Sequence, residues 1–148
     1  MPEMQRSATI AATPNVIWSI VADPGRASEW MPDVRERRLL THGPLGVGSR
    51  WEERGSLHDK PYMVTHEITE WQPPTRFSYR QVDAKRNSEW LETVSLEPRD
   101  AGVRVTIALE FRFPGGLLGR LYERSVFRKD FALTLNRRLE SLKERAEH

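Results

Sequence analysis

The hydrophobic residues of this chain change their spacing at residues 114–116, Pro-Gly-Gly. Before this point apolar and polar side chains alternate as in strands, most clearly at Val103, Val105, Ile107, Leu109, Phe111 and Phe113. After it they recur at helical spacing, at Leu121, Phe127, Phe131, Leu135, Leu139 and Leu142. The second pattern predicts one helix of roughly 25–30 residues, against a usual length of about 11–12. Because a long helix with one apolar stripe must cover an apolar surface, we expect it to lie on a sheet.

Regular turn signals divide the chain from Val34 to Phe113 into short strands. Gly, Pro, Asn and Asp gather at 43–48, 58–61, 73–74, 83–87 and 100–102. The segments between them predict strands that begin near Val34 and then lie at Ser49–Ser56, Tyr62–Trp71, Arg76–Val82, Glu89–Glu97 and Val103–Phe113. Consecutive strands with short connections indicate an antiparallel meander.

The first 32 residues predict a strand followed by two short helices. The strand covers Met4 to Ala12, and Thr13 then provides a helix N-cap, with Pro14 at the first helical position. Asp23-Pro24 repeats this signal for a second helix, which Pro32 ends beyond Trp30.

Composition excludes several classes of protein. The 148 residues suit one domain, 1–148, and the absence of Cys excludes disulfides and thiolate sites. The 23 basic and 21 acidic residues are interleaved, which argues against nucleic-acid binding. No apolar run reaches the ~20 residues of a membrane span, and the polar N-terminus lacks a signal core, so we expect a cytoplasmic protein without stable membrane insertion. The four His residues are not paired at metal-binding spacing, so no metal site is predicted.

Three polar residues fall at strand positions that should point inward. Alternation places His66 with Val64 and Ile68, Tyr79 with Phe77, and Glu92 with Trp90 and Val94; Trp51 and Glu53 share a face by the same rule. One interpretation is that His66 and Glu92 pair with each other, or with Arg80 or Arg104, and merely satisfy burial. The other is that they orient a ligand carbonyl or hydroxyl and exchange protons with it.

Four motifs give the chain a family resemblance: IAATPNVIW at 10–18, Asp23 followed by WMP at 30–32, GVGSRW at 46–51 and TEWQPPTRF at 69–77. Together they resemble the SRPBCC superfamily, also called the START-like or Bet v-type helix-grip fold, and within it the polyketide cyclase/dehydrase-like group of small bacterial proteins. The resemblance implies an α+β helix-grip fold, in which a curved antiparallel seven-stranded sheet wraps around a long C-terminal helix. Two short helices follow strand 1 and close one end, with Trp18 as part of the plug.

The resemblance also implies an internal, mainly apolar cavity for a small hydrophobic or amphipathic ligand of lipid, polyketide or isoprenoid type. The expected ligand-binding residues are Trp30, Trp51, His66, Tyr79, Trp90, Glu92, Phe111 and Phe131. A carrier or sensor role is the first expectation. The alternatives are a cyclase/dehydratase-like enzyme without metal or organic cofactor, in which His66, Tyr79 and Glu92 are the catalytic candidates, and a protein-interaction module without a ligand. Either a monomer or a homodimer is compatible with the sequence.

Overall fold

The computed structural model describes residues 3–57, 59–84, 88–113, 115–122 and 127–148. Its strands are β1 (Met4–Ile10), β2 (Val34–Leu39), β3 (Arg50–Leu57), β4 (Lys60–Gln72), β5 (Arg76–Gln81), β6 (Glu89–Arg99) and β7 (Gly102–Arg112). Its α-helices are α1 (Pro14–Val21), α2 (Ala27–Trp30), α3 (Gly116–Tyr122) and α4 (Arg128–Glu147), and a short 3₁₀ turn covers Pro24–Arg26.

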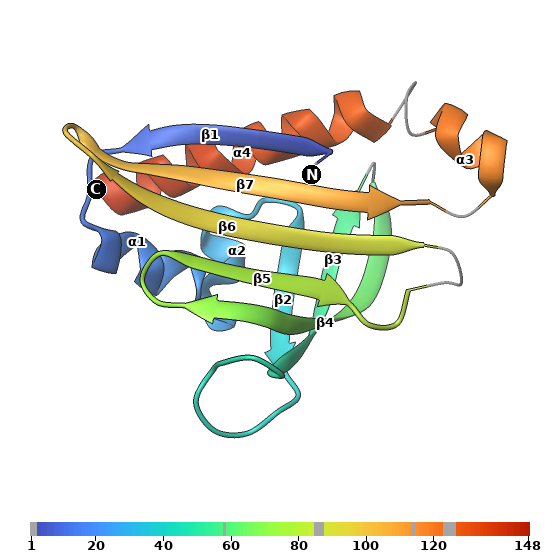
Figure 1. Ribbon diagram of the computed structural model, residues 1–148, viewed down its shortest axis with the longest axis horizontal. Coiled ribbons are helices and arrows are strands. Elements are labelled where there is room, and N and C mark those ends of the chain that lie inside the picture. The colour runs from blue at the N-terminus through green and yellow to red at the C-terminus, as the bar shows by residue number, and fades with distance from the viewer. Residues whose placement is uncertain (1–2, 58, 85–87, 114, 123–126) are drawn as a thin grey trace.

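The seven strands form one antiparallel sheet in the order β1-β7-β6-β5-β4-β3-β2. The order follows the chain except that β1 lies beside β7, so the first strand pairs with the last. The sheet curves around α4, which runs along its inner side, as Figure 1 shows. This arrangement confirms the predicted helix-grip fold.

The two N-terminal helical segments begin where their caps predicted. The Thr13 hydroxyl accepts a hydrogen bond from the Val16 N–H, and Pro14 is the first helical residue. The Asp23 carboxylate accepts from the Gly25 N–H, and the chain then forms the 3₁₀ turn and α2. Helix α1 lies at the end of the sheet opposite α3, and α2 lies between α1 and β2 (Figure 1).

The C-terminal helix is shorter than the sequence pattern predicted. The 20 residues of α4 carry the expected buried stripe of Phe131, Leu135, Leu139 and Leu142. Residues 116–122 instead form the separate helix α3, and 123–126 lie outside the described residues. Leu121, which we expected in the stripe, is 52% exposed. The physical reason is that β7 ends at Arg112, so α3 lies beyond the sheet that would have covered it (Figure 1).

Two irregularities in strand pairing decide which side chains face α4. The register of β2 against β3 shifts between Val34 and Glu36, and that of β4 against β5 shifts between Ile68 and Glu70. Each β-bulge adds one residue and so reverses the alternation beyond it. As a result Arg37 is buried, and Trp71 packs against Phe77.

Gly102 at the start of β7 should not tolerate a side chain. Its φ is +139°, and a Cβ there would lie 2.1 Å from the Ile10 carbonyl oxygen. We expect Gly102→Ala to lower the free energy of unfolding in urea by at least about 2 kcal/mol. Gly46→Ala, with nothing within 4 Å of the added Cβ, is the matched control and should change stability by no more than about 0.5 kcal/mol. Equal effects of the two variants would contradict the close approach of β1 and β7.

Candidate functional site

A group of charged and polar side chains is buried between α4 and the sheet. Its charged members are almost fully enclosed, with 7% exposure for Arg37, 4% for Glu53, 3% for Glu92 and 2% for Arg138. We call this group the buried polar cluster; it consists of Asp33, Arg37, Glu53, His66, Tyr79, Glu92 and Arg138. Because charged residues are seldom fully buried in a protein interior, the cluster is the most distinctive feature inside this fold.

Strand pairing brings the members of the cluster together from distant parts of the sequence. Trp51 on β3 lies opposite His66 on β4, and Tyr79 on β5 lies opposite Glu92 on β6. The bulge in β2 adds Arg37 to the same face. The sheet therefore supplies one wall of the site, and α4 supplies Arg138 from the other side.

Glu53 is held in its ionised form by three neighbours. Its carboxylate accepts a hydrogen bond from Arg37 Nε at 2.7 Å and another from the Tyr62 hydroxyl at 2.8 Å, and His66 Nε2 lies 3.6 Å away. Burial by itself would raise the pKa of Glu53, but the Arg37 guanidinium and the His66 imidazole together hold that pKa well below its usual range.

Tyr79 connects Arg37 to Glu92. The Tyr79 hydroxyl accepts from Arg37 Nη2 at 2.9 Å and donates to the Glu92 carboxylate. Burial raises the pKa of Tyr79 well above its usual value, and the charge of Glu92 acts in the same direction, so Tyr79 stays neutral and serves as a donor. The other Glu92 oxygen accepts from Trp90 Nε1 at 3.0 Å.

Arg138 ties α4 to two other elements. Its Nε donates to Asp33 Oδ1 at 2.8 Å, its Nη2 donates to the second Asp33 oxygen, and its Nη1 lies 3.3 Å from Glu92 Oε2. Asp33 immediately precedes β2, so one guanidinium links the C-terminal helix to the start of β2 and to β6. The carboxylates of Asp33 and Glu92 offset the effect of burial and raise the pKa of Arg138 well above its usual value.

Aromatic rings surround the cluster in two groups. The first stacks around Arg37, whose guanidinium carbon lies 4.9 Å from the ring centroids of both Trp51 and Tyr79, with His66 4.9 Å from Tyr79. The second contains Phe111, Phe127 and Phe131 around Trp90, with Trp90 and Phe131 in edge-to-face contact at 5.2 Å. The hydrogen bond from Trp90 to Glu92 joins the two groups.

Among the described residues, three buried side-chain polar atoms have no hydrogen-bond partner: Trp30 Nε1, Trp51 Nε1 and His66 Nδ1. Trp51 and His66 are cross-strand neighbours with ring centroids 5.8 Å apart. An unpaired buried donor costs roughly 1–3 kcal/mol, so such atoms normally find a partner. The unpaired atoms of Trp51 and His66 therefore lie beside the charged cluster with hydrogen-bonding capacity that no side chain there uses.

Seven of the eight expected site residues are buried and Trp90 is partly buried, and the structure sorts them into groups. Trp51, His66, Tyr79 and Glu92 lie around the polar cluster, while Trp90, Phe111 and Phe131 form the neighbouring aromatic group. Trp30 is buried on α2, and among the described residues no ring-to-ring contact joins it to either group.

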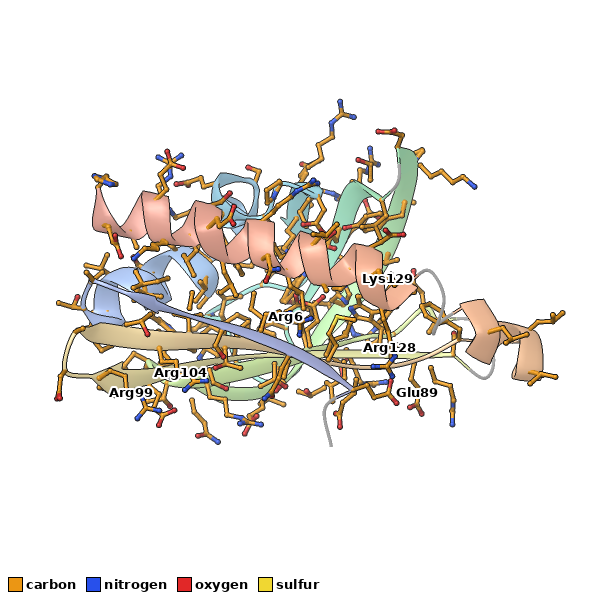
Figure 2. All side chains as sticks on the ribbon, turned by 90° about the horizontal axis from the view of Figure 1, so that it is seen from above. Arg6, Glu89, Arg99, Arg104, Arg128 and Lys129 are labelled. Carbon is orange, nitrogen blue, oxygen red and sulfur yellow. The ribbon has the colours of Figure 1, made fainter. Side chains whose placement is uncertain are left out.

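The pairing partners proposed from the sequence were wrong. Arg80 is exposed and bonds to Glu67, and Arg104 is exposed on the outer face of the sheet, as Figure 2 shows. Glu92 bonds to Tyr79, Trp90 and Arg138 instead. The alternation of apolar and polar residues does not show which arginine pairs with Glu92. Nothing in the local sequence distinguishes an arginine that bonds across the interior from one that bonds on the surface.

Sequence reasoning also missed Arg37 and Arg138. The burial of Arg138 could have been predicted, because it lies three residues after Leu135 and four before Leu142, inside the apolar stripe of α4. The burial of Arg37 could not have been predicted. Uninterrupted alternation from Val34 points its side chain to the solvent, and only the bulge turns it inward.

A curved antiparallel sheet wrapped around a long C-terminal helix, with short helices after the first strand, defines the helix-grip class of proteins. The chain belongs to the polyketide cyclase / dehydrase and lipid transport family, whose sequence model matches residues 1–147.

Solved structures agree with this class. The protein TTHA0849 of Thermus thermophilus is 19% identical with a TM-score of 0.80, over 98% of this chain and 97% of that one. The aromatase/cyclase ZhuI of Streptomyces sp. R1128 is 17% identical with a TM-score of 0.77, over 97% and 92%. The major latex-like protein 151 of Panax ginseng is 11% identical with a TM-score of 0.78, over 97% and 95%. These likenesses show the shared fold.

No curated protein matches the sequence. No helix within the described ranges combines the length and apolar character needed to cross a membrane.

Removal of Arg138 should destabilise the fold strongly. Arg138→Ala leaves the carboxylates of Asp33 and Glu92 buried without their cation, which should lower the free energy of unfolding by about 3–5 kcal/mol. The neighbouring Arg137 is exposed, so Arg137→Ala is the matched control and should change it by less than about 0.5 kcal/mol. Chemical denaturation of both variants checks this, and similar losses would show that Arg138 does not hold the cluster.

Glu53 should make the fold sensitive to acid. Its pKa is depressed in the folded state, so the unfolded chain takes up a proton first as the pH falls, and stability is lost below about pH 5. We therefore expect the stability of Glu53→Gln, measured by urea denaturation, to fall less steeply between about pH 5 and pH 3 than that of the wild type. Parallel curves would mean that other carboxylates account for the acid sensitivity.

Proposed function

We propose that the chain binds a small amphipathic molecule beside the buried polar cluster, as a carrier or sensor. The observation that carries the proposal is that two side chains on neighbouring strands beside the cluster have unpaired atoms, Trp51 Nε1 and His66 Nδ1. The Trp51 indole N–H can only donate, so the complementary molecule presents an oxygen acceptor to it. The rings of Trp51, Tyr79 and His66 would pack against its apolar part.

The comparisons support this class of ligand. The description of the family joins polyketide cyclases and dehydrases with lipid transport. Polyketides and lipids both combine an apolar body with a few oxygens. ZhuI is described as an aromatase/cyclase, whereas TTHA0849 has no activity in its description. Because one fold serves several roles, the site itself has to decide between them.

The hydrogen bonding of the cluster favours binding over catalysis. Tyr79 and Glu92 bond to each other, and their remaining capacity goes to Arg37, Trp90 and Arg138. A general acid or base must exchange a proton with the substrate, and the hydrogen bonds that Tyr79 and Glu92 already make hinder this exchange. The Trp51 N–H and the free nitrogen of His66 can meet a ligand without breaking any bond in the cluster.

A cyclase/dehydrase activity is the second candidate, and His66 is the residue that favours it. Its Nδ1 is unpaired, and Glu53 lies on the other side of the ring, so the imidazole is oriented with one nitrogen free. In an aldol closure, Nδ1 would take the proton from the carbon between two carbonyls, and the Trp51 N–H would bond the carbonyl oxygen on which negative charge develops. The protein would otherwise contribute by holding the chain in a folded conformation.

The first experiment is native mass spectrometry of freshly purified protein beside its denatured mass. An adduct that is lost on denaturation would give the mass of the ligand. The enzyme alternative is tested with a linear poly-β-ketone thioester: turnover lost in His66→Gln with binding retained would establish it. Binding of the thioester by the wild type without turnover would support the carrier or sensor role.

Trp51→Phe should lower the affinity for the ligand and leave the stability of the fold nearly unchanged. The substitution keeps an aromatic ring and removes an N–H that has no partner, which offsets the packing lost against Arg37, so the free energy of unfolding should change by no more than about 1 kcal/mol. Affinity for a hydroxyanthraquinone probe, measured by calorimetry, should fall about three- to tenfold.

The control for this prediction is Trp18→Phe, because Trp18 packs against Trp71 and Phe77 outside the polar cluster. Its affinity for the probe should equal that of the wild type. A Trp51→Phe protein that is less stable and binds the probe normally would assign the unpaired atoms to internal water.

A further inference from the structure

Helix α3 exposes three leucines, whereas the leucines of the α4 stripe are buried. Leu117 is 74% exposed, Leu118 is 77% exposed and Leu121 is 52% exposed, whereas Leu135, Leu139 and Leu142 of α4 are at most 3% exposed. We call Leu117, Leu118 and Leu121 the leucine face of α3. Figure 1 shows α3 beyond the end of β7, so the sheet does not cover this face.

A helix of this length is a poor candidate for independent stability. It has seven residues, two of them glycines, and isolated helices shorter than ~12–15 residues are marginal in water. Exposed leucines that stand alone, such as Leu133 on α4, need no explanation. Three within five positions form a patch that favours contact with an apolar phase or partner.

Basic residues flank the leucine face. The sequence of α3 contains one arginine and no acidic residue. Arg128 and Lys129 start α4 at the end nearest α3, as Figure 2 shows, and Arg112 ends β7 just before it. Arg112 pairs with Glu89 at the surface, Arg128 donates to the Glu3 carbonyl oxygen, and Lys129 is exposed. The acidic Glu3, Glu89 and Asp130 offset three of these four basic charges.

We propose that α3 docks the protein peripherally on an anionic lipid bilayer. The leucine face enters the boundary between headgroups and acyl chains, and Lys129 and Arg112 lie at the level of the phosphates. Leucines beside cations match both parts of such a surface, because apolar burial and attraction to anionic lipid add. The proposal concerns the outer surface, so it goes beyond the proposed function and does not depend on any ligand in the interior.

Two other occupants fit less well. Nucleic acid would satisfy the cations but leave the leucines in water. A second copy packed through the same face would bury the leucines, but a two-fold interface would also bring Lys129 and its neighbours on both copies close together. A bilayer accommodates leucines and cations at once.

The test is co-sedimentation of the full chain with lipid vesicles. We expect binding to vesicles that contain phosphatidylglycerol, weaker binding to pure phosphatidylcholine vesicles, and a decrease as salt rises and screens the charges. The double variant Leu117→Ser/Leu118→Ser should lose at least about tenfold in apparent affinity. Leu133→Ser, at a similarly exposed leucine on α4, is the matched control and should bind like the wild type.

Further measurements separate the alternatives. Lys129→Gln should reduce binding to phosphatidylglycerol vesicles and leave the thermal unfolding temperature unchanged, which excludes a folding defect as the cause. Trp51→Phe should sediment like the wild type, so failure of the interior site leaves this result intact. Absence of sedimentation with anionic vesicles, or equal sedimentation of the double leucine variant, would overturn the proposal. A dimer in light scattering that the double variant dissociates would assign the leucine face to self-association.

Discussion

The guanidinium of Arg138 is the contact on which the arrangement of the interior depends. It bonds to Asp33 before β2 and to Glu92 on β6, so one side chain of α4 fixes the helix against two separate parts of the chain. The apolar stripe around it can slide along a sheet with little change in energy, because hydrophobic contact is non-directional. Two charge-assisted bonds in fixed directions define a single position, and Glu92 then orients Tyr79, Arg37 and Glu53 in turn.

An interior of this kind is not the most stable that the fold could have. Replacement of a buried ion pair by well-packed apolar residues is often neutral or stabilising, so the cluster is poorly explained by stability alone. The three carboxylates of the cluster outnumber its two arginines. Polar groups of defined position beside two aromatic walls are what recognition of an amphipathic molecule requires, and the unpaired atoms of Trp51 and His66 lie at the same place.

The two proposals concern the interior and the outer surface of the molecule, and they complement each other. A protein that carries an amphipathic molecule must take it up and deliver it, and a lipid bilayer is one phase in which such molecules collect. Helix α3, which carries the leucine face, lies at the end of the sheet opposite α1 (Figure 1). The family joins cyclases and lipid transport under one description, which is consistent with a scaffold whose interior and surface vary independently.

The sequence alone determined the order of the elements and the inward face of most strands, because caps, turns and period-two alternation are local properties. It therefore placed His66, Tyr79 and Glu92 in the interior correctly. Only the tertiary structure decided how they are paired, since the bulge beside Val34 turns Arg37 inward and packing of α4 brings Arg138 to Asp33 and Glu92. The separation of α3 from α4 also depended on where the sheet ends. A helical repeat in the sequence shows which side chains share a face, but burial of that face requires a surface that other parts of the chain provide.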